Sequence, residues 1–342
     1  MDYRQSGVDI DAGHEVVRRI RSLAKGTFTA GVLSDIGSFG GLFGLSGSDT
    51  RDPVLVASAD GVGTKLRVAF MTGIHTTIGA DLVNHCVNDI LVQGARPLFF
   101  LDYLATGRLE PDVAVQIVEG LAGACRANGC ALLGGETAEM PGFYADGEYD
   151  VAGFIVGIVS RERLIDGRTI RPGDALIGIP SSGLHTNGYS LARRIAFEVA
   201  GLEPGARVPE LGATIGEALL APHRTYLPLI TPLLDSGVIK GLAHITGGGI
   251  TDNLPRILPG GSRALVDRRA WEVPALFRWL QATGGVPDED MLRTFNMGIG
   301  LIVVCSAEAA PRLLAHLASA GESGAVQIGH IEEGGKGVRY AG

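Results

Sequence analysis

Hydrophobic and polar positions follow two different periods along this chain. Short apolar runs rich in valine, isoleucine and leucine are typical of strands, whereas apolar positions repeating every three to four residues are typical of helices. Strands are predicted over residues 54–57, 98–101, 151–159, 175–179, 264–266 and 299–304. Helices are predicted over residues 12–24, 77–93, 112–127, 190–199, 226–234, 274–282 and 308–320. Because the two kinds of element do not alternate strictly, we expect an α+β fold rather than a doubly wound parallel sheet.

The length of the chain predicts two domains, since 342 residues exceed the usual size of a single hydrophobic core. The best predicted linker is the polar stretch of residues 161–174, which contains Asp-Gly and Pro-Gly pairs. We therefore expect one α+β domain over residues 1–168 and a second over residues 169–342.

Composition and charge narrow the class of protein. Hydrophobic residues make up 46% of the chain and charged residues 19%, which indicates a globular protein with well-filled cores. A net charge of -8 argues against nucleic-acid binding. The chain lacks an apolar run of membrane-spanning length and a signal-peptide profile, so we expect no membrane association and a cytoplasmic location. The four cysteines fit no zinc spacing and are expected to be free, mostly buried thiols.

The predicted helix 77–93 carries an unusual polar stripe opposite its apolar face. The stripe consists of Asp81, Asn84, His85, Asn88 and Asp89. A solvated stripe normally uses Lys, Glu, Arg and Gln, whereas short Asp, Asn and His side chains lower helix propensity. This composition indicates that the stripe lines a functional site.

The segment 134–142, GGETAEMPG, follows an apolar run and holds two carboxylates, Glu136 and Glu139, between glycines and a proline. It has the composition of neither a good helix nor a good strand. Paired carboxylates without basic neighbours suit a hard cation such as Mg²⁺. The alternative interpretation is a solvated turn between strands.

A second candidate segment follows the predicted strand 54–57. Asp60, Gly61, Gly63, Thr64 and Lys65 put a carboxylate, two glycines, a hydroxyl and an ammonium within about one turn. The spacing is not that of a Walker A loop, yet these groups resemble a grip for phosphate and metal. The alternative is an Asp-Gly hairpin turn followed by a solvated lysine.

Two loops in the second half have the composition of anion sites. Residues 181–190 place hydroxyls, glycines, an amide and His185 before a predicted helix, where backbone N–H groups favour anions. His185 is a candidate phosphate donor or general acid-base, the alternative being helix capping with a surface histidine. The glycine loop 244–249 is a weaker signal, and the glycine loop 36–44 is either a mobile lid or a turn. The remaining histidines outside these loops are predicted to be structural or surface residues: His14, His75, His223, His316 and His330.

Together these segments resemble the phosphoribosylformylglycinamidine cyclo-ligase (aminoimidazole ribonucleotide synthetase) family of purine biosynthesis. The matching segments are colinear and span nearly the whole chain: 7–13, 60–66, 86–89, 134–142, 185–190, 246–249 and 293–298. The resemblance implies ATP-dependent cyclisation of formylglycinamidine ribonucleotide to aminoimidazole ribonucleotide, with release of ADP and phosphate. It also implies a homodimer, in which the N-terminal ATP- and Mg²⁺-binding domain forms a sheet or barrel across the interface and the C-terminal domain completes the active site.

The resemblance assigns roles to particular residues. Magnesium ligands are expected at Asp60, Asp89 and Glu136, and catalytic roles at His185 and Lys65. ATP or phosphate contacts are expected at Lys25, Gly40, Gly41, Gly61, Gly63 and Thr64. Substrate contacts are expected at Ser182, Thr186, Asn187, Gly248 and Gly249. Residues 25–31 depart from the family pattern, because they lack the basic-then-Pro-Glu run of many members.

Other functions stay open at this point. Related ATP-dependent enzymes of the same superfamily include thiamine-monophosphate kinase, hydrogenase-maturation dehydratase and selenophosphate synthetase. The last expects a reactive cysteine in the glycine loop 36–44, which holds none, and the dehydratase expects a C-terminal cysteine tail, whereas this chain ends in Tyr340-Ala341-Gly342. An alternative of a different class is a non-catalytic nucleotide-binding protein.

Overall fold

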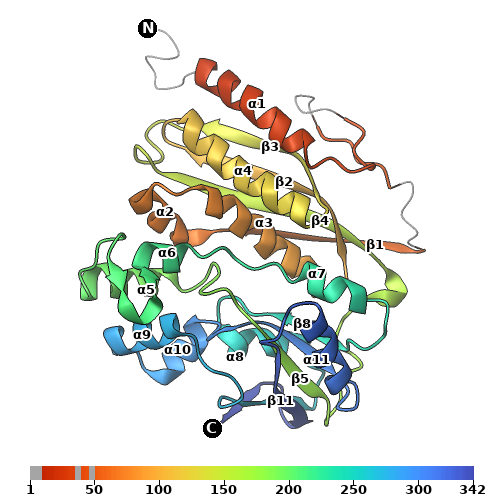
Figure 1. Ribbon diagram of the computed structural model, residues 1–342. Coiled ribbons are helices and arrows are strands. Elements are labelled where there is room, and N and C mark those ends of the chain that lie inside the picture. The colour runs from red at the N-terminus through yellow and green to blue at the C-terminus, as the bar shows by residue number, and fades with distance from the viewer. Residues whose placement is uncertain (1–9, 35–39, 46–50) are drawn as a thin grey trace. The chain divides into compact units, whose positions relative to one another are not determined.

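The computed structural model describes residues 10–34, 40–45 and 51–342, and the chain divides into two compact units. Unit 1 comprises Met1–Ile90 and Ala95–Arg161, and unit 2 comprises Leu91–Gly94 and Glu162–Gly342. From Glu162, at the start of the predicted linker 161–174, to its C-terminal residue, the chain belongs to unit 2. Each unit has its own sheet and helices (Figure 1).

Unit 1 is built on a mixed four-stranded sheet of order β1-β4-β2-β3. Strand β4 pairs antiparallel with both β1 and β2, whereas β2 and β3 run parallel. The strands are β1 (Pro53–Gly61), β2 (Arg96–Thr106), β3 (Ala131–Glu139) and β4 (Tyr149–Ser160). The helices are α1 (Ile10–Lys25), α2 (Leu66–Thr72), α3 (Thr76–Leu91) and α4 (Pro111–Ala127).

Helices α3 and α4 lie over one face of this sheet (Figure 1) and approach each other closely at two glycines. A Cβ on Gly79 would lie 2.1 Å from the carbonyl oxygen of Ile117, and one on Gly120 would lie 2.0 Å from that of Thr76. Only glycine permits this backbone contact. This contact fixes the position of α3, and with it the polar stripe, relative to α4.

The opposite face of the sheet in unit 1 is apolar and exposed. Leu55 on β1 and Phe154 on β4 are 57% and 45% exposed. Both belong to the alternate positions that point away from α3, since the intervening Val56 and Ile155 are buried. An apolar sheet face of this kind is typical of an interaction surface.

Unit 2 is built on a six-stranded mixed sheet of order β12-β9-β11-β5-β10-β8, with a separate two-stranded ribbon of β6 and β7. The strands are β5 (Ala175–Pro180), β6 (Arg207–Val208), β7 (Ala213–Thr214), β8 (Gly241–His244), β9 (Ser262–Asp267), β10 (Ile299–Cys305), β11 (Val326–Glu333) and β12 (Val338–Ala341). The helices are α5 (Tyr189–Arg193), continued as a π-helix over Arg194–Val199, and α6 (Ile215–Leu220), α7 (Leu227–Ile230), α8 (Gly249–Asn253), α9 (Ala275–Gly284), α10 (Asp288–Thr294) and α11 (Ala310–Ser319). Strand β10 is buried along its whole length and, with the aliphatic side chains of its neighbours, forms the core of the unit.

The predicted α+β class is confirmed, and each predicted strand and helix falls on an observed element. The interpretation of residues 134–139 as neither strand nor helix is wrong, because they form the second half of β3. Glycine and glutamate have low strand propensity, yet parallel pairing with β2 supplies the backbone hydrogen bonds. The four cysteines are free and buried, as predicted. Among the described residues, the structure contains no helix with the length and apolarity needed to span a membrane.

Candidate functional site

In unit 1, two carboxylates converge on one buried histidine. Asp60 lies near the end of β1, and His85 and Asp89 lie on adjacent turns of α3. The Nε2 atom of His85 is 2.8 Å from Oδ2 of Asp60 and 3.9 Å from Oδ2 of Asp89. Ser58 Oγ donates to Asp89 Oδ2 at 3.1 Å, and the Gly61 N–H donates to Asp60 Oδ1 at 2.8 Å. The structure therefore brings together Asp60 and Asp89, two of the three predicted metal ligands.

The electrostatics of this cluster favour charged groups. Burial acts to raise the pKa of Asp60, but the hydrogen bond and charge of His85 outweigh it and hold that pKa below its ordinary value. Burial acts to lower the pKa of His85, but its hydrogen bond to Asp60 and the charges of Asp89, Asp60 and Asp81 raise it. An ionised Asp60 next to Asp89 gives an oxygen-rich, negatively charged position at the end of β1.

In the rest of the polar stripe, Asp81 and Asn88 are buried and Asn84 is half-buried. Asp81 accepts from Lys65 Nζ at 2.8 Å, and both side chains are fully buried. Burial lowers the pKa of Lys65, and the charge of Asp81 opposes that effect. Further along the stripe, Asn84 Oδ1 accepts from Asn128 Nδ2 at 2.9 Å. The ion pair of Lys65 with Asp81 thus connects the turn after β1 to α3. A fully buried ammonium in such a pair positions the turn and is not exposed to a nucleotide.

Glu136 lies on a different face of the sheet from Asp60. A Cβ on Gly135 would lie 2.3 Å from Oδ1 of Asp102, so the next residue, Glu136, points to the other side of β3. Asp60 pairs with Gly153, whose missing side chain would meet Leu82 of α3, so Asp60 faces the helices. Among the described residues, no group of three metal-binding side chains within 4.8 Å contains Glu136. The structure does not assemble the predicted three-carboxylate set within one chain.

The other predicted nucleotide contacts in unit 1 are mostly exposed. Thr64, Gly63 and Gly40 are exposed, and Gly63 adopts φ +63°, which favours glycine. Lys25 is exposed in the last turn of α1. Gly41 has a packing role, since a Cβ there would lie 2.4 Å from the Leu133 side chain. Residues 7–9 and 36–39 of the sequence motifs lie outside the described residues.

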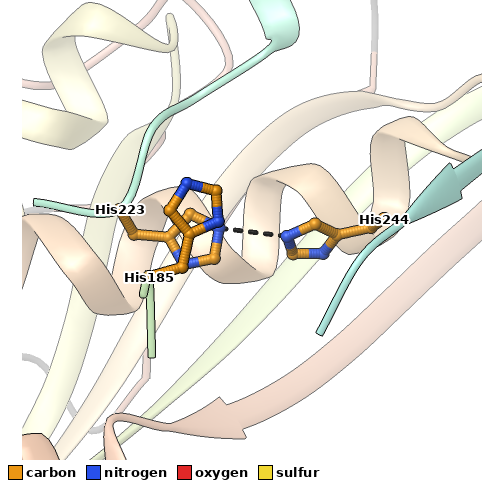
Figure 2. Close-up of side chains that lie close together, drawn as sticks. All are labelled: His185, His223 and His244. Carbon is orange, nitrogen blue, oxygen red and sulfur yellow. Dashed lines mark hydrogen bonds between the residues drawn. The ribbon is translucent and has the colours of Figure 1, made fainter. Parts of the chain in front are cut away.

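In unit 2, His185 belongs to a buried histidine cluster in which His223 contacts both other rings (Figure 2). Its ring stacks on that of His223, with centroids 3.9 Å apart and an interplanar angle of 20°. His223 Nε2 in turn lies 3.0 Å from Nε2 of His244, the last residue of β8. His185 also accepts from the Ser182 N–H at 3.2 Å and adopts φ 61°, which is rare for a residue with a side chain.

The cluster shows what the sequence interpretation missed. His223 was predicted to be a structural or surface residue, and its burial against His185 excludes the surface alternative. Its place in the cluster depends on the tertiary fold, because it is far from His185 in sequence. The predicted substrate residue Thr186 adjoins it, with Oγ1 3.4 Å from Nδ1 of His223.

Two asparagines outside the predicted set hold the loops of unit 2. Asn253 Nδ2 donates to the carbonyl oxygens of Thr246, Gly247 and Gly249 at 3.3, 3.0 and 2.8 Å. Asn296 Nδ2 donates to the carbonyl oxygen of Gly183 at 2.9 Å. In the sequence, the only sign of either residue is an asparagine close to a glycine-rich loop. Hydrophobic periodicity does not show that its side-chain amide is buried and holds that loop.

The remaining predicted substrate contacts of unit 2 lie in these two loops. Ser182 Oγ donates to the carbonyl oxygen of Pro222 at 2.5 Å, and Asn187 Nδ2 donates to Thr186 Oγ1 at 3.5 Å. Gly248 and Gly249 both adopt positive φ, and a Cβ on Gly249 would lie 2.1 Å from the Leu292 carbonyl oxygen. These glycines are therefore required by the turn itself, whichever ligand it binds.

Comparison with known proteins shows that the two units match the N-terminal and C-terminal domains of one protein family. Residues 48–159 match the family AIR synthase related protein, N-terminal domain, and residues 171–342 match AIR synthase related protein, C-terminal domain. Solved structures of the same fold include thiamine-monophosphate kinase from Stenotrophomonas maltophilia and E. coli HypE, a hydrogenase maturation protein. Each is 20% identical with a TM-score of 0.68; they cover 96% of this chain and 96% and 94% of their own. These two structures are similar in fold.

Curated relatives are much more similar in sequence. Phosphoribosylformylglycinamidine cyclo-ligase of Gloeobacter violaceus is 54% identical over all of both chains. That of Trichlorobacter lovleyi is 53% identical over 96% of this chain and 94% of its own. The chain belongs to the phosphoribosylformylglycinamidine cyclo-ligase family, and the resemblance found in the sequence is confirmed.

Proposed function

We propose that this protein is a ligase that uses ATP to close the imidazole ring of aminoimidazole ribonucleotide from formylglycinamidine ribonucleotide, releasing ADP and phosphate. The observation that carries the proposal is the convergence of Asp60 and Asp89 on His85 in a chain of this family. Both carboxylates are partly exposed, and carboxylate oxygens are the ligands that Mg²⁺ prefers.

The chemistry asks mainly for positioning and charge neutralisation. A formamide carbon is a poor electrophile, and transfer of the γ-phosphoryl group to its oxygen converts that oxygen into a phosphate leaving group. A nitrogen of the substrate then attacks the carbon, the C–N bond forms, the C–O bond breaks and phosphate leaves. Such a reaction needs aligned groups and stabilised oxygens more than covalent participation by the protein.

Asp60 and Asp89 have the hard oxygen donors that Mg²⁺ prefers, and the lowered pKa of Asp60 keeps it ionised at neutral pH. When bound, Mg²⁺ would neutralise charge on the ATP phosphates. Lys65 fixes the turn that carries Gly61, Gly63 and Thr64 through its ion pair with Asp81. We assign this turn to the nucleotide phosphates.

We assign the loops of unit 2 to the amidine substrate and the transferred phosphoryl group. The stack with His223 and the Ser182 N–H orient the His185 ring. Ser182, Thr186 and Asn187, with the backbone of Gly248 and Gly249, present hydroxyl, amide and N–H groups to a polar ligand. His185 is the proposed donor to the phosphoryl oxygens.

We also propose a homodimer that pairs the exposed sheet faces of unit 1. Leu55 and Phe154 lie on that face, and Glu136 points to the same side of the sheet. With a second copy seated on this face, Glu136 would then lie at the interface, on the side of the sheet away from Asp60 and the helices.

The test is Asp89→Asn, assayed with ATP, Mg²⁺ and the amidine ribonucleotide by mass spectrometry of the imidazole product. Wild type should form the product, and the variant should fold but lose about 10²-fold or more in rate, as for loss of one electrostatic stabiliser. Asp146→Asn, at an exposed position of unit 1, is the matched control and should behave as wild type. Wild type without product would contradict the function, and Asp89→Asn within about threefold of wild type would remove Asp89 from the site.

A further inference from the structure

We propose that His185, His223 and His244 form a binding site for a transition-metal ion of the Zn²⁺ type. The three imidazoles are buried in unit 2 and come from three separate segments of the chain. One nitrogen from each ring lies within 4.8 Å of the other two. Figure 2 shows the rings of His185 and His223 together, with His244 directed at them from the end of β8.

The spacing of His223 and His244 is close to that of two ligands on one ion. Zn–N bonds of about 2.0–2.1 Å at tetrahedral angles separate neighbouring nitrogens by about 3.3–3.4 Å. The two Nε2 atoms face each other at 3.0 Å. An ion bound by both nitrogens lies to one side of the line that joins them. Binding therefore requires the rings to separate by a few tenths of an ångström and to tilt until both lone pairs point at the ion.

His185 supplies the third nitrogen after a side-chain rotation. Its ring is stacked on His223, so it must turn out of the stack to direct a lone pair at the ion. The rotation gives up the hydrogen bond from the Ser182 N–H, which is long at 3.2 Å. Formation of a metal–nitrogen bond offsets the loss of this contact.

The surroundings of the cluster match a histidine metal site. A metal-binding histidine normally has its other ring nitrogen hydrogen-bonded, which fixes the ring orientation. Thr186 Oγ1 lies 3.4 Å from Nδ1 of His223 and so directs its Nε2 toward His244. Three neutral imidazoles suit Zn²⁺, Co²⁺ or Ni²⁺ and discriminate against Mg²⁺, which prefers carboxylate oxygens. Three protein ligands leave a fourth position for water or a substrate atom.

Occupation of this site would have a regulatory effect. His185 is the proposed donor to the phosphoryl group, and an ion that holds its ring elsewhere removes it from that role. Zn²⁺ would then act as an inhibitor. This consequence rests on the proposed function, whereas metal binding itself does not.

The experiment is a titration of chelator-treated full-length protein with CoCl₂, followed by the visible absorption of bound Co²⁺, with ZnCl₂ as the displacing ion. We expect one equivalent of Co²⁺ per chain, displacement by Zn²⁺ and no displacement by Mg²⁺. His223→Asn keeps a polar atom at the position that faces Thr186 but removes Nε2. It should weaken binding by about 10²-fold or more, at least the loss seen for outer-shell changes.

His14→Asn, at an exposed histidine of α1, is the control and should bind as wild type. Circular dichroism of the metal-free variants separates loss of a ligand from loss of the fold, and His244→Asn is the second variant should His223→Asn not fold. Wild type that takes up no stoichiometric Co²⁺, or a folded His223→Asn that binds as wild type, would overturn the proposal. Neither result would bear on the proposed ligase activity, which is measured with Mg²⁺ alone.

Discussion

The backbone of His185 is in the left-handed region, where residues with a side chain are uncommon. Such a conformation costs about 1–3 kcal/mol and tends to persist where a side chain must point in a particular direction. In this loop it directs the imidazole into the buried cluster of unit 2, toward His223. The strain is consistent with a functional orientation of the ring.

His185→Asn separates this role from a structural one, because asparagine tolerates the left-handed backbone better than other residues. We expect kcat to fall by about 10²-fold with KM changed much less, since charge grows on the phosphoryl oxygens mainly in the transition state. Steady-state kinetics for both substrates provides the measurement. A retained kcat would rule out the assignment, and a rise in KM alone would indicate a ground-state phosphate contact.

Asp102 on β2 is a buried carboxylate that packs against the backbone of Gly135 on β3. Burial raises the pKa of its carboxyl from 3.8 to about 7, against the opposing effect of a backbone hydrogen bond. In the unfolded chain the same carboxyl ionises near its ordinary value. Between those two values the folded state holds a proton that the unfolded state has lost, so Asp102 makes the protein less stable as pH rises.

Asp102→Asn removes this titration. The stability of wild type relative to the variant should fall by about 2 kcal/mol between pH 5 and pH 8. Urea unfolding of both proteins at the two pH values measures the difference. A gap that does not change with pH would show that Asp102 ionises in the folded state as it does in the unfolded chain.

At the residue scale, the sequence predicted side chains whose neighbours are local. The stripe from Asp81 to Asp89 was visible because one helix carries it, and its short polar residues indicated a functional site. His223 was not visible, because only the tertiary fold brings it to His185. The direction of Lys65 was equally hidden, since sequence spacing does not show whether an ammonium points to solvent or to Asp81.

At the scale of elements, the contact between α3 and α4 depends on two glycines that hydrophobic periodicity does not single out. Gly79 and Gly120 allow the backbones to touch, and any side chain there would push the helices apart. Since α3 carries His85 and Asp89, the spacing of these helices also sets the geometry of the carboxylate cluster.

Two glycines of α4 provide a matched pair of variants. Gly120→Ala should destabilise the protein by at least about 2 kcal/mol, because its Cβ would overlap the Thr76 carbonyl. Gly123→Ala has room, with no atom closer than 4.0 Å, and should stabilise by up to about 1 kcal/mol through helix propensity. Chemical unfolding of both variants tests the contact, which equal effects of the two substitutions would disprove.

Element prediction succeeded where burial imposed a long regular period, as in α4 and β4, and failed where pairing alone made the element. The second half of β3 is a strand because β2 pairs with it. The short strand β8 and helix α10 have too few residues to show a period, and so were not predicted.

At the scale of the whole molecule, the exposed apolar face of the sheet in unit 1 has the features of a subunit interface. Phe154→Glu places a charge in the middle of that face and should yield a monomer at micromolar concentration, whereas we expect wild type to be a dimer. Val199→Glu is the control, since Val199 is 60% exposed in unit 2 and lies outside the proposed interface. Light scattering distinguishes the states, and a monomeric wild type or a dimeric Phe154→Glu would contradict the proposal.

The sequence could not show how Glu136 relates to Asp60, because composition does not reveal which face of a sheet a side chain takes. The family motifs placed all three carboxylates in one ligand set, and the structure puts Glu136 on the far face of β3 from the helices. The face follows from strand pairing and a register shift between Phe100 and Leu101, neither of which is visible in sequence.

Leu91–Gly94 belong to unit 2, although the residues on both sides of them belong to unit 1. This arrangement limits where the chain can be cut to produce the two units separately. These residues pack with the segment just after Arg161, where the Ile165 N–H donates to the Gln93 carbonyl oxygen at 3.2 Å. A cut at residue 161 would leave this piece of unit 2 on the other polypeptide. Unit 2 produced alone from residue 162 would therefore lack residues 91–94, which pack with it in the intact chain. A split version of the enzyme has to keep these residues in contact with unit 2.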